Sequence, residues 1–345
     1  MVSLPSLNRG DRVAVLSPSF AAPGMFPEVF ELGLSRMRDV FGLEPVEFPT
    51  TRKLGASAEE RSRDLVAAFE DPSIKAVIAS IGGDDQVTYV HRLPPEPFAR
   101  NPKPFFGYSD NSHLANFLWL QGVPSFYGGS IMTQYAMQGQ MDEYTVQHVR
   151  HALFGGADEV ELKPSATFNE VGLGWDDPAN LYRRREHVPN EGWVWDGTGE
   201  ASGVTWGGCL ESIDEMLRHA VPIPTLEQFE GVALLLETSE EIPLADYVRR
   251  VLRALGERGV LERLSAVLVG RPKAWEFDKP QPPEAREAYR RQQQETIVGA
   301  VRAYNEAAPI VQNLEFGHTD PQVPMPYGGR VRVDAGARRL FVRFR

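Results

Sequence analysis

The sequence predicts an α/β fold in which helices cover both faces of a parallel sheet, followed by a second domain. Its 345 residues exceed what one small core needs and suit two domains of ordinary size. In the first half, short apolar runs typical of buried strands alternate with stretches of helical spacing. The runs end near Ser, Pro or Gly, where a strand passes through a turn into the next helix. Repeated strand–turn–helix units form parallel sheets, which is why we expect this fold class.

The first half provides three such units. Strands are expected at residues 12–16, 76–81 and 104–108, and helices at residues 27–41, 58–69 and 111–120. The second of these helices follows Ser57 and Glu60, whose spacing is that of a capping box, in which each side chain bonds the backbone N–H of the other residue. Gly82 and Gly83 follow the second strand, and Ser109 follows the third.

The second half also mixes strands and helices. Strands are expected at residues 232–236, 266–269 and 309–314, helices at 210–219, 244–255 and 283–305, and a terminal hairpin at 330–333 with 340–344. We expect Gly207 and Gly208 to form a turn before the first of these helices. Between the halves, residues 172–199 hold three tryptophans and three consecutive arginines among Pro, Asn and Gly. This segment is either an inter-domain connection that carries an active-site loop or a plain surface linker.

Composition and charge exclude several classes of protein. The net charge of −11 repels phosphate backbones, so nucleic-acid binding is not expected. No run approaches 18 apolar residues and the N-terminus lacks the pattern of a secretion signal, so we expect a cytoplasmic protein without a membrane span. Cys209 is the only cysteine, which excludes an internal disulfide framework and a multi-cysteine zinc site.

Ser109 is the first candidate for a catalytic residue. It lies between an expected strand and an expected helix, where a sharp turn exposes the hydroxyl and the helix N-terminus supplies N–H groups. Gly107 gives the room that such a turn needs, although Asn111 stands where hydrolases of this type have a second glycine. A Ser-Asp pair at the start of a helix can also be a simple cap.

A serine nucleophile needs a base, and the base needs a carboxylate that orients it. Among the seven histidines, His318 is the best candidate, because it follows Gly317 just after an expected strand. Parallel sheets present catalytic groups at such strand ends. Glu237 ends another apolar strand and is expected to be partly buried, so an imidazole N–H would be a suitable partner. Glu240 and Glu241 are its competitors.

Gly82 and Gly83 complete the candidate site. Two glycines after a buried strand let backbone N–H groups point inward, where they can bind the oxyanion of a tetrahedral intermediate. The expected oxyanion donors are the N–H groups of Gly83 and Asp110, and Gly82 is an expected substrate contact. A phosphate-binding turn is the alternative, but the chain has neither a dinucleotide fingerprint nor a P-loop lysine.

Taken together, these motifs resemble the LD-carboxypeptidase family of serine peptidases. They run along nearly the whole chain as Ile81-Gly82-Gly83, Gly107-Tyr108-Ser109-Asp110, Gly207-Gly208, Leu236-Glu237-Thr238-Ser239-Glu240 and Gly317-His318. The resemblance implies a catalytic triad of Ser109, Glu237 and His318.

The resemblance also implies a domain organisation. A flavodoxin-like N-terminal domain is expected at residues 1–168, a connection with an active-site loop at 169–202, and a swivelling β/α domain at 203–345. The first domain would carry the serine and the last one the other two triad residues. A homodimer without metal or cofactor is implied as well.

Two branches of the family differ in substrate. One removes the terminal D-alanine from murein tetrapeptides. The other resembles the microcin C resistance peptidase, which cleaves the amide between an aminoacyl group and a nucleotide-like sulfamate or phosphoramidate. The segments around Glu237 and Trp193 are more similar to the second branch, which implies that Trp193 stacks on the nucleobase, with Trp195 as the alternative. Gly208 and Cys209 are expected substrate contacts, although the family usually has Asn at position 209.

Other features leave the substrate and the function class open. Asp84 and Asp85 follow the glycine pair where the family is less acidic, and their charge disfavours a carboxylate or phosphate substrate. A non-catalytic small-molecule binding protein and a nucleotide-dependent enzyme on a Rossmann-like sheet are the alternatives of other classes. Labelling of Ser109 by a fluorophosphonate would count against the first, and tight binding of NAD or FAD would favour the second.

Overall fold

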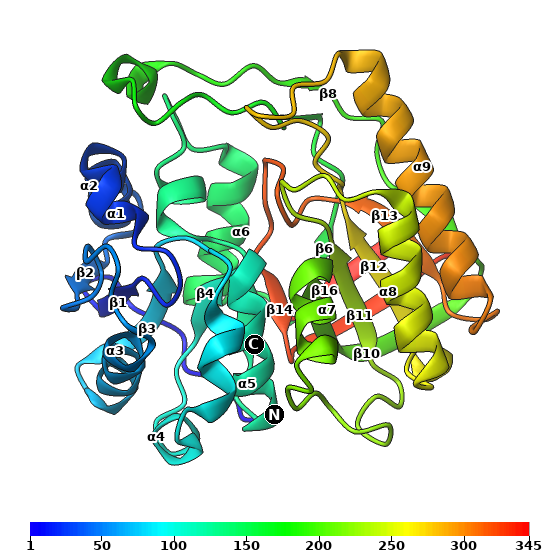
Figure 1. Cartoon of the computed structure of the whole chain (residues 1–345), viewed down its shortest axis with the longest axis horizontal. Helices are drawn as coiled ribbons and strands as arrows, with labels where there is room; N and C mark the ends of the chain where they lie inside the picture. The colour runs from blue at the N-terminus through cyan, green and yellow to red at the C-terminus, as the bar shows by residue number, and fades with distance from the viewer. Residues whose placement is uncertain (345) are drawn as a thin grey trace.

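Two sheets flanked by helices lie side by side in the computed structural model, which describes residues 1–344 (Figure 1). The N-terminal elements, drawn in blue and cyan, form one half of the view. Helices α8 (Ala245–Glu257) and α9 (Pro283–Arg302) lie on the far side of the other half. The predicted α/β fold with a parallel sheet is confirmed.

The first sheet has six strands in the order β14-β5-β4-β3-β1-β2. They are β1 (Arg12–Leu16), β2 (Glu44–Glu47), β3 (Ile74–Ala79), β4 (Phe105–Gly107), β5 (Ser125–Tyr127) and β14 (Met325–Tyr327). The five N-terminal strands pair in parallel. Strand β14 comes from the C-terminal part of the chain and pairs antiparallel with β5, so the end of the chain closes one edge of this sheet.

Helices cover both faces of the first sheet, as predicted. They are α1 (Ala22–Met25), α2 (Pro27–Arg36), α3 (Ala58–Glu70), α4 (Pro95–Arg100), α5 (Ser112–Leu120) and α6 (Glu143–Phe154). Successive side chains of a strand point to opposite faces, and β1 shows the result. Val13 and Val15 share a core with residues of α2 and α6, whereas Ala14 and Leu16 share another with residues of α3, α4 and α5.

The second sheet has eight strands in the order β6-β16-β15-β10-β11-β12-β13-β9. They are β6 (Val160–Leu162), β9 (Val194–Asp196), β10 (Glu200–Cys209), β11 (Ala233–Glu237), β12 (Ala266–Gly270), β13 (Ile310–Leu314), β15 (Arg330–Asp334) and β16 (Arg339–Val342). Strands β10 to β13 are parallel, and β15 and β16 form the predicted hairpin. Besides α8 and α9, this half contains α7 (Leu210–Arg218). Strands β7 (Thr167–Phe168) and β8 (Val188–Pro189) form a separate pair.

Local details agree with several predictions. The capping box is present, because Ser57 Oγ accepts the N–H of Glu60 at 3.3 Å and Glu60 Oε2 accepts the N–H of Ser57 at 2.9 Å. The helix expected at residues 27–41 continues past α2 as a π-helical turn over Met37–Phe41. The domain boundaries at residues 168 and 203 remain a prediction, and strands β6, β9 and β14 each pair across them.

The turn expected at Gly207 and Gly208 is wrong, because both residues belong to the end of strand β10. They adopt φ angles of +140° and +115°, which other residues rarely take. A Cβ at Gly207 would lie 1.9 Å from the carbonyl oxygen of Leu235 on the neighbouring strand. Glycine at 207 therefore permits close strand packing.

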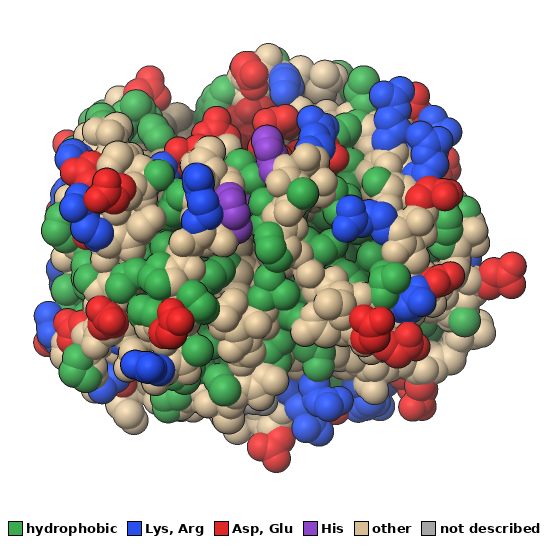
Figure 2. All heavy atoms as spheres, turned by 60° about the horizontal axis from the view of Figure 1, so that its bottom comes forward, with side chains coloured by type: hydrophobic (Ala, Val, Ile, Leu, Met, Phe, Trp, Pro, Cys, Tyr) green, Lys and Arg blue, Asp and Glu red, His purple; other side chains and the backbone are tan. Residues whose placement is uncertain are grey.

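No helix in the described chain is long and apolar enough to cross a membrane. On the face shown in Figure 2, Lys and Arg side chains are interspersed with Asp and Glu and form no continuous basic area.

Candidate active site

Ser109 lies at a strained turn between β4 and α5. Its φ of +63° is in the left-handed region, which residues other than glycine seldom adopt and which often marks a functional constraint. Strand β4 ends at Gly107, and a short 3-10 turn over Ser109–Asn111 leads into α5. Ser109 thus has the backbone geometry of a nucleophile elbow at the carboxyl end of a parallel strand.

Asn111, which stands where a second glycine was expected, holds this turn in place. Its Nδ2 donates to the carbonyl oxygens of Tyr108 at 3.0 Å and Ile81 at 3.1 Å. Its Oδ1 accepts from Gln86 Nε2 at 2.8 Å. A Cβ at Gly107 would lie 2.9 Å from the Cβ of Asn111, so the glycine that remains makes room for the asparagine.

Glu237 and His318 form a pair at the same end of the second sheet. Glu237 is the last residue of β11 and is 1% exposed, and its Oε2 lies 2.7 Å from His318 Nδ1. A Cβ at Gly317 would lie 2.5 Å from Glu237 Oε2, so glycine at 317 permits this approach. A carboxylate at Nδ1 holds the proton of a neutral imidazole there and leaves Nε2 as an acceptor. This is the arrangement of a general base with its orienting carboxylate.

Tyr127 joins the nucleophile turn to this pair. Its hydroxyl donates to Glu237 Oε1 at 2.5 Å and accepts the N–H of Ser109 at 3.1 Å. The side chain is completely buried at the end of β5. Burial and the charge of Glu237 raise the pKa of Tyr127, so the phenol stays a neutral donor. In the sequence it is indistinguishable from a core tyrosine, and only its place at the end of the strand after the Ser109 helix could have indicated it.

The carboxylate of Glu240 contacts the other ring nitrogen of His318. Its Oε2 lies 3.0 Å from Nε2, and no hydrogen bond joins His318 to Ser109 Oγ. Burial acts to lower the pKa of His318, but the carboxylates of Glu237 and Glu240 outweigh it and raise that pKa to about 10. Burial likewise acts to raise the pKa of Glu240, but the His318 contact lowers it to about 2. In this state the imidazole is protonated at neutral pH and bridges two carboxylates.

Gly82 and Gly83 lie close to the nucleophile turn. A Cβ at Gly82 would lie 2.9 Å from Ser109 Cβ and 3.1 Å from its Oγ. A Cβ at Gly83 would lie 1.9 Å from Ser19 Oγ. Within the described residues the N–H of Gly83 has no acceptor, so it is available to a ligand.

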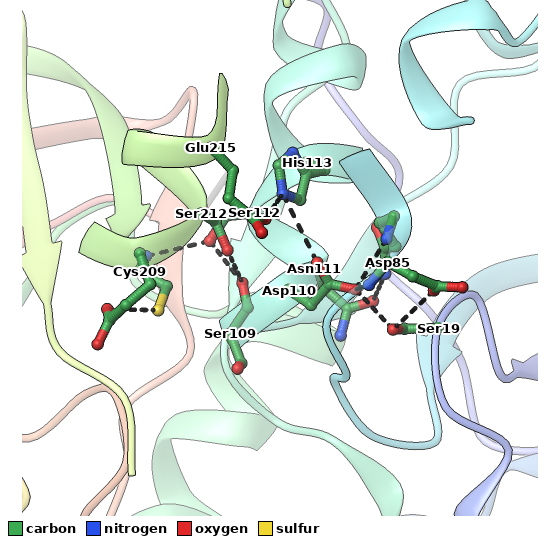
Figure 3. Close-up of polar contacts among 12 residues, drawn as sticks. Ser19, Asp85, Ser109, Asp110, Asn111, Ser112, His113, Cys209, Ser212 and Glu215 are labelled. Carbon is green, nitrogen blue, oxygen red and sulfur yellow. Dashed lines mark hydrogen bonds and ion pairs between the residues drawn. The ribbon is translucent and has the colours of Figure 1, made fainter. Parts of the chain in front are cut away.

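The side chain of Asp110 ties the glycine loop to the nucleophile turn (Figure 3). Its Oδ2 accepts from Ser19 Oγ at 2.5 Å and from the backbone N–H groups of Asp85 at 3.2 Å and Gln86 at 3.1 Å. Burial raises the pKa of Asp110. The predicted donor N–H of Asp110 is therefore positioned by its own side chain.

Asp110 also belongs to a cluster with His113 and Glu215, drawn in Figure 3, whose possible ligand atoms lie within 4.8 Å of one another. His113 Nε2 lies 3.1 Å from Glu215 Oε2 and 3.6 Å from Asp110 Oδ1. A metal-bound imidazole donates its other N–H to an acceptor, but His113 Nδ1 is buried without a partner in the described part of the chain. The cluster therefore fits a histidine hydrogen-bonded to a carboxylate better than a metal centre.

Ser109 and His318 both line a cavity of about 820 Å³ to which the two halves of the chain contribute. Gly82, Gly83 and Glu240 line it as well. Residues 172–176 of the connection form part of its wall. The cavity is large enough for a ligand of nucleotide or short-peptide size.

Trp193, the expected stacking residue, does not line this cavity. Its Nε1 donates to Glu315 Oε2 at 2.8 Å, and its ring lies 6.0 Å from that of Trp195. Trp175, from the same connection, is the tryptophan on the wall, and it packs edge-on against Phe26 at 5.4 Å. Trp175 therefore replaces Trp193 as the candidate for stacking on a substrate.

Gly208 and Cys209 also lie outside the cavity lining. A Cβ at Gly208 would lie 2.5 Å from Ser112 Oγ, and the N–H of Cys209 donates to the same oxygen at 3.1 Å. The Cys209 thiol is buried and contacts Glu211 Oε2. Both residues lie against Ser112 at the start of α5 and so help to hold the turn that carries Ser109.

Known proteins match this chain over nearly its whole length. Residues 13–128 match the family model of the LD-carboxypeptidase N-terminal domain, and residues 202–333 match that of the LD-carboxypeptidase C-terminal domain. The putative carboxypeptidase YocD of Bacillus subtilis is 26% identical over 97% of this chain and 98% of its own length. A probable murein peptide carboxypeptidase of the same organism is 23% identical over 98% of this chain and 93% of its own length.

Solved structures of related proteins have the same fold. An MccF-like protein from Streptococcus pneumoniae in complex with AMP has a TM-score of 0.83 and 26% identity, covering 97% of this chain and 99% of its own. The microcin C7 self-immunity protein MccF, in complex with aspartyl sulfamoyl adenosine, has a TM-score of 0.84 at 19% identity, covering 99% and 98%. The chain therefore belongs to the LD-carboxypeptidase family of serine peptidases.

Proposed function

We propose that this protein is a serine carboxypeptidase or amidase in which Ser109 is the nucleophile, His318 the general base and Glu237 the residue that orients the base. One observation carries the proposal. The strained elbow at Ser109 and the Glu237–His318 pair, which come from different sheets, meet at one cavity.

The proposed reaction has two stages. Ser109 Oγ attacks the carbonyl carbon of the substrate while His318 Nε2 takes its proton. The C–N bond then breaks, His318 gives the proton to the leaving nitrogen, and the acyl group stays on Ser109 as an ester. His318 next takes a proton from water, which attacks the ester and releases the acid, and the proton returns to Ser109.

The N–H groups of Gly83 and Asp110 are the proposed donors to the oxyanion. The free N–H of Gly83 beside Ser109 and the fixed position of Asp110 at the start of a helix support this role. Such donors stabilise the negative charge that develops on the carbonyl oxygen in the transition state.

The substrate that we propose is a microcin C-like aminoacyl-nucleotide, cleaved at the amide of its aminoacyl group. The complexes of the related proteins with AMP and with aspartyl sulfamoyl adenosine support this choice, as does Trp175 on the cavity wall. The second candidate is removal of the terminal D-alanine from murein tetrapeptide, which the similarity to a probable murein peptide carboxypeptidase supports.

Hydrolysis of both substrate types by the purified protein tests the proposal, with Ser109→Ala as the control. We expect release of the free amino acid from an aminoacyl sulfamoyl adenosine by the wild type and none by the variant. A Ser109→Ala protein with full activity would refute the role of Ser109. Release of D-alanine alone would select the murein substrate.

A non-catalytic binding protein predicts a different result. It would bind these ligands without turning them over, and a fluorophosphonate would leave Ser109 unmodified. Stoichiometric labelling of Ser109, located by mass spectrometry of the digested protein, would exclude that alternative.

A further inference from the structure

The wall of the cavity carries excess negative charge. The two Lys and Arg side chains that line it among the described residues are paired with acids of the same wall: Arg185 Nη1 lies 2.6 Å from Asp320 Oδ2, and Lys273 Nζ lies 2.5 Å from Glu276 Oε2. Neither cation is left to bind an anionic ligand.

Other acids of the wall have no such partner. Asp84, Asp176 and Glu241 line the cavity and form no ion pair with any residue between 1 and 344. Glu240 is paired only with His318 in the same range. A ligand in this cavity therefore meets a negative potential, which favours a positively charged group.

Glu240 is the acid nearest to the reacting groups, and it is less firmly held than Glu237. The Glu237 side chain is completely buried and accepts a hydrogen bond from Tyr127 at 2.5 Å. The Glu240 side chain is 50% exposed and follows β11 in a loop. Of the two carboxylates that bind His318, Glu240 is the one that a ligand can reach and displace.

The contact between Glu240 and His318 blocks the proposed base. Nδ1 faces Glu237 and Nε2 faces Glu240, so the ring has no free lone pair to accept the Ser109 proton. Catalysis therefore requires that Glu240 leave Nε2.

We propose that Glu240 makes the enzyme selective for acyl groups with a cationic side chain, because an ammonium or guanidinium that binds Glu240 draws it away from His318 and frees the base. The inference rests on the proposed function, since it assigns the acyl part of the same substrate. The selectivity is therefore expected in kcat as well as in binding, because the cationic side chain of the substrate releases His318 from Glu240.

The surroundings of His318 set the expected pH dependence. Glu237 and Glu240 are the charged groups that raise its pKa, and the neutral Tyr108 ring packs against it at 5.0 Å. The charge of Lys273 helps to lower the pKa of Glu240, but its ammonium is bound to Glu276. Loss of the Glu240 charge lowers the pKa of His318, so the unprotonated base is present at lower pH.

The test measures the rate at which a fluorophosphonate labels Ser109, because that rate depends on the base and on no particular amide substrate. A nearby opposite charge shifts a pKa by about one unit or more, so Glu240→Gln is expected to label roughly tenfold faster at neutral pH, with its profile moved to lower pH. Lysine amide is expected to accelerate labelling of the wild type, and norleucine amide, which has a similar shape and the same α-amino group but no charge on its side chain, is not.

Glu241→Gln is the matched control. It makes the same chemical change at the next residue, which does not contact His318, so its labelling profile is expected to follow the wild type. In direct turnover, lysyl sulfamoyl adenosine is expected to have a higher kcat than norleucyl sulfamoyl adenosine, and this preference is expected to disappear in Glu240→Gln.

The outcomes separate the two proposals. If Ser109 is labelled but Glu240→Gln keeps the wild-type profile, or norleucine amide accelerates labelling as much as lysine amide, the inference on Glu240 is wrong and the proposed function stands. If neither the wild type nor Glu240→Gln is labelled at Ser109, the proposed function is wrong, and so is the inference that rests on it. Thermal melting of Glu240→Gln verifies that the half-exposed substitution leaves the fold intact.

Discussion

Replacement of Tyr127 by phenylalanine removes one oxygen atom at the junction of the two halves of the proposed triad. That oxygen takes part in two hydrogen bonds, one to Glu237 Oε1 and one from the N–H of Ser109. Phenylalanine keeps the ring and its packing. The change therefore isolates the contribution of the hydroxyl.

The burial of Glu237 sets the size of the effect. At 1% exposure its Oε1 cannot exchange the lost donor for water. A hydrogen bond to a charged group contributes about 1.5–3 kcal/mol, which corresponds to roughly a 10- to 100-fold fall in kcat if the loss appears in the transition state. Without its donor, the carboxylate attracts the imidazole proton more strongly. The pKa of His318 rises, and the acid limb of the pH–rate profile moves to higher pH.

Steady-state kinetics measured as a function of pH give both the fall in kcat and the shift of the acid limb. Tyr135→Phe is the matched control, because Tyr135 is also completely buried and its hydroxyl has no hydrogen-bond partner among residues 1–344. Removing that hydroxyl is expected to leave kcat and the acid limb unchanged and to keep or increase the melting temperature. If Tyr127→Phe lowers the melting temperature but keeps the wild-type kcat and pH profile, Tyr127 is only a packing residue and the reasoning is wrong.

Further predictions concern the cavity and the assembly. Trp175→Ala is expected to raise KM for an aminoacyl-nucleotide roughly tenfold or more, the effect of one lost base stack, with little change in kcat. Trp193→Ala is expected to lower the melting temperature while KM stays near the wild-type value. Gly83→Ala brings a Cβ within 1.9 Å of Ser19 Oγ, so the loop must shift, and kcat is expected to fall about 100-fold as an oxyanion donor is lost, with circular dichroism as the check on folding. Ser109→Ala is expected to lose all turnover at an unchanged melting temperature. Light scattering is expected to give the mass of a dimer.

The features that could be predicted from the sequence are those with a local signal. Strand β1 matches its apolar run residue for residue, and the capping box at Ser57 has the expected bonds. Ser109, Glu237 and His318 were identifiable because each polar residue follows a strand or ends one. Parallel sheets bring such positions to one edge, which applies to Glu237 and His318 of the second sheet. That Ser109 of the first sheet joins them is implied by the resemblance to the family.

The residues that could not be predicted act across the two sheets. Tyr127 follows an ordinary apolar pattern, and its bond to Glu237 exists only because β5 lies near the end of β11. Trp175 and Trp193 share one irregular segment, so spacing could not tell which ring faces the cavity. Glu240 was recognised as an acid near the site, but as a competitor of Glu237 and not as a second partner of the same histidine.

The connection after His318 links the base to the strand that holds the nucleophile in place. From His318 the chain returns to the first sheet as β14, where it pairs with β5, whose last residue is Tyr127. Tyr127 in turn bonds both Ser109 and Glu237. A shift of one sheet against the other would therefore lengthen these bonds, and it would also disturb the hydrophobic cluster that residues of both sheets share. Activity is thus expected to fall together with the melting temperature when the β14–β5 pairing is changed.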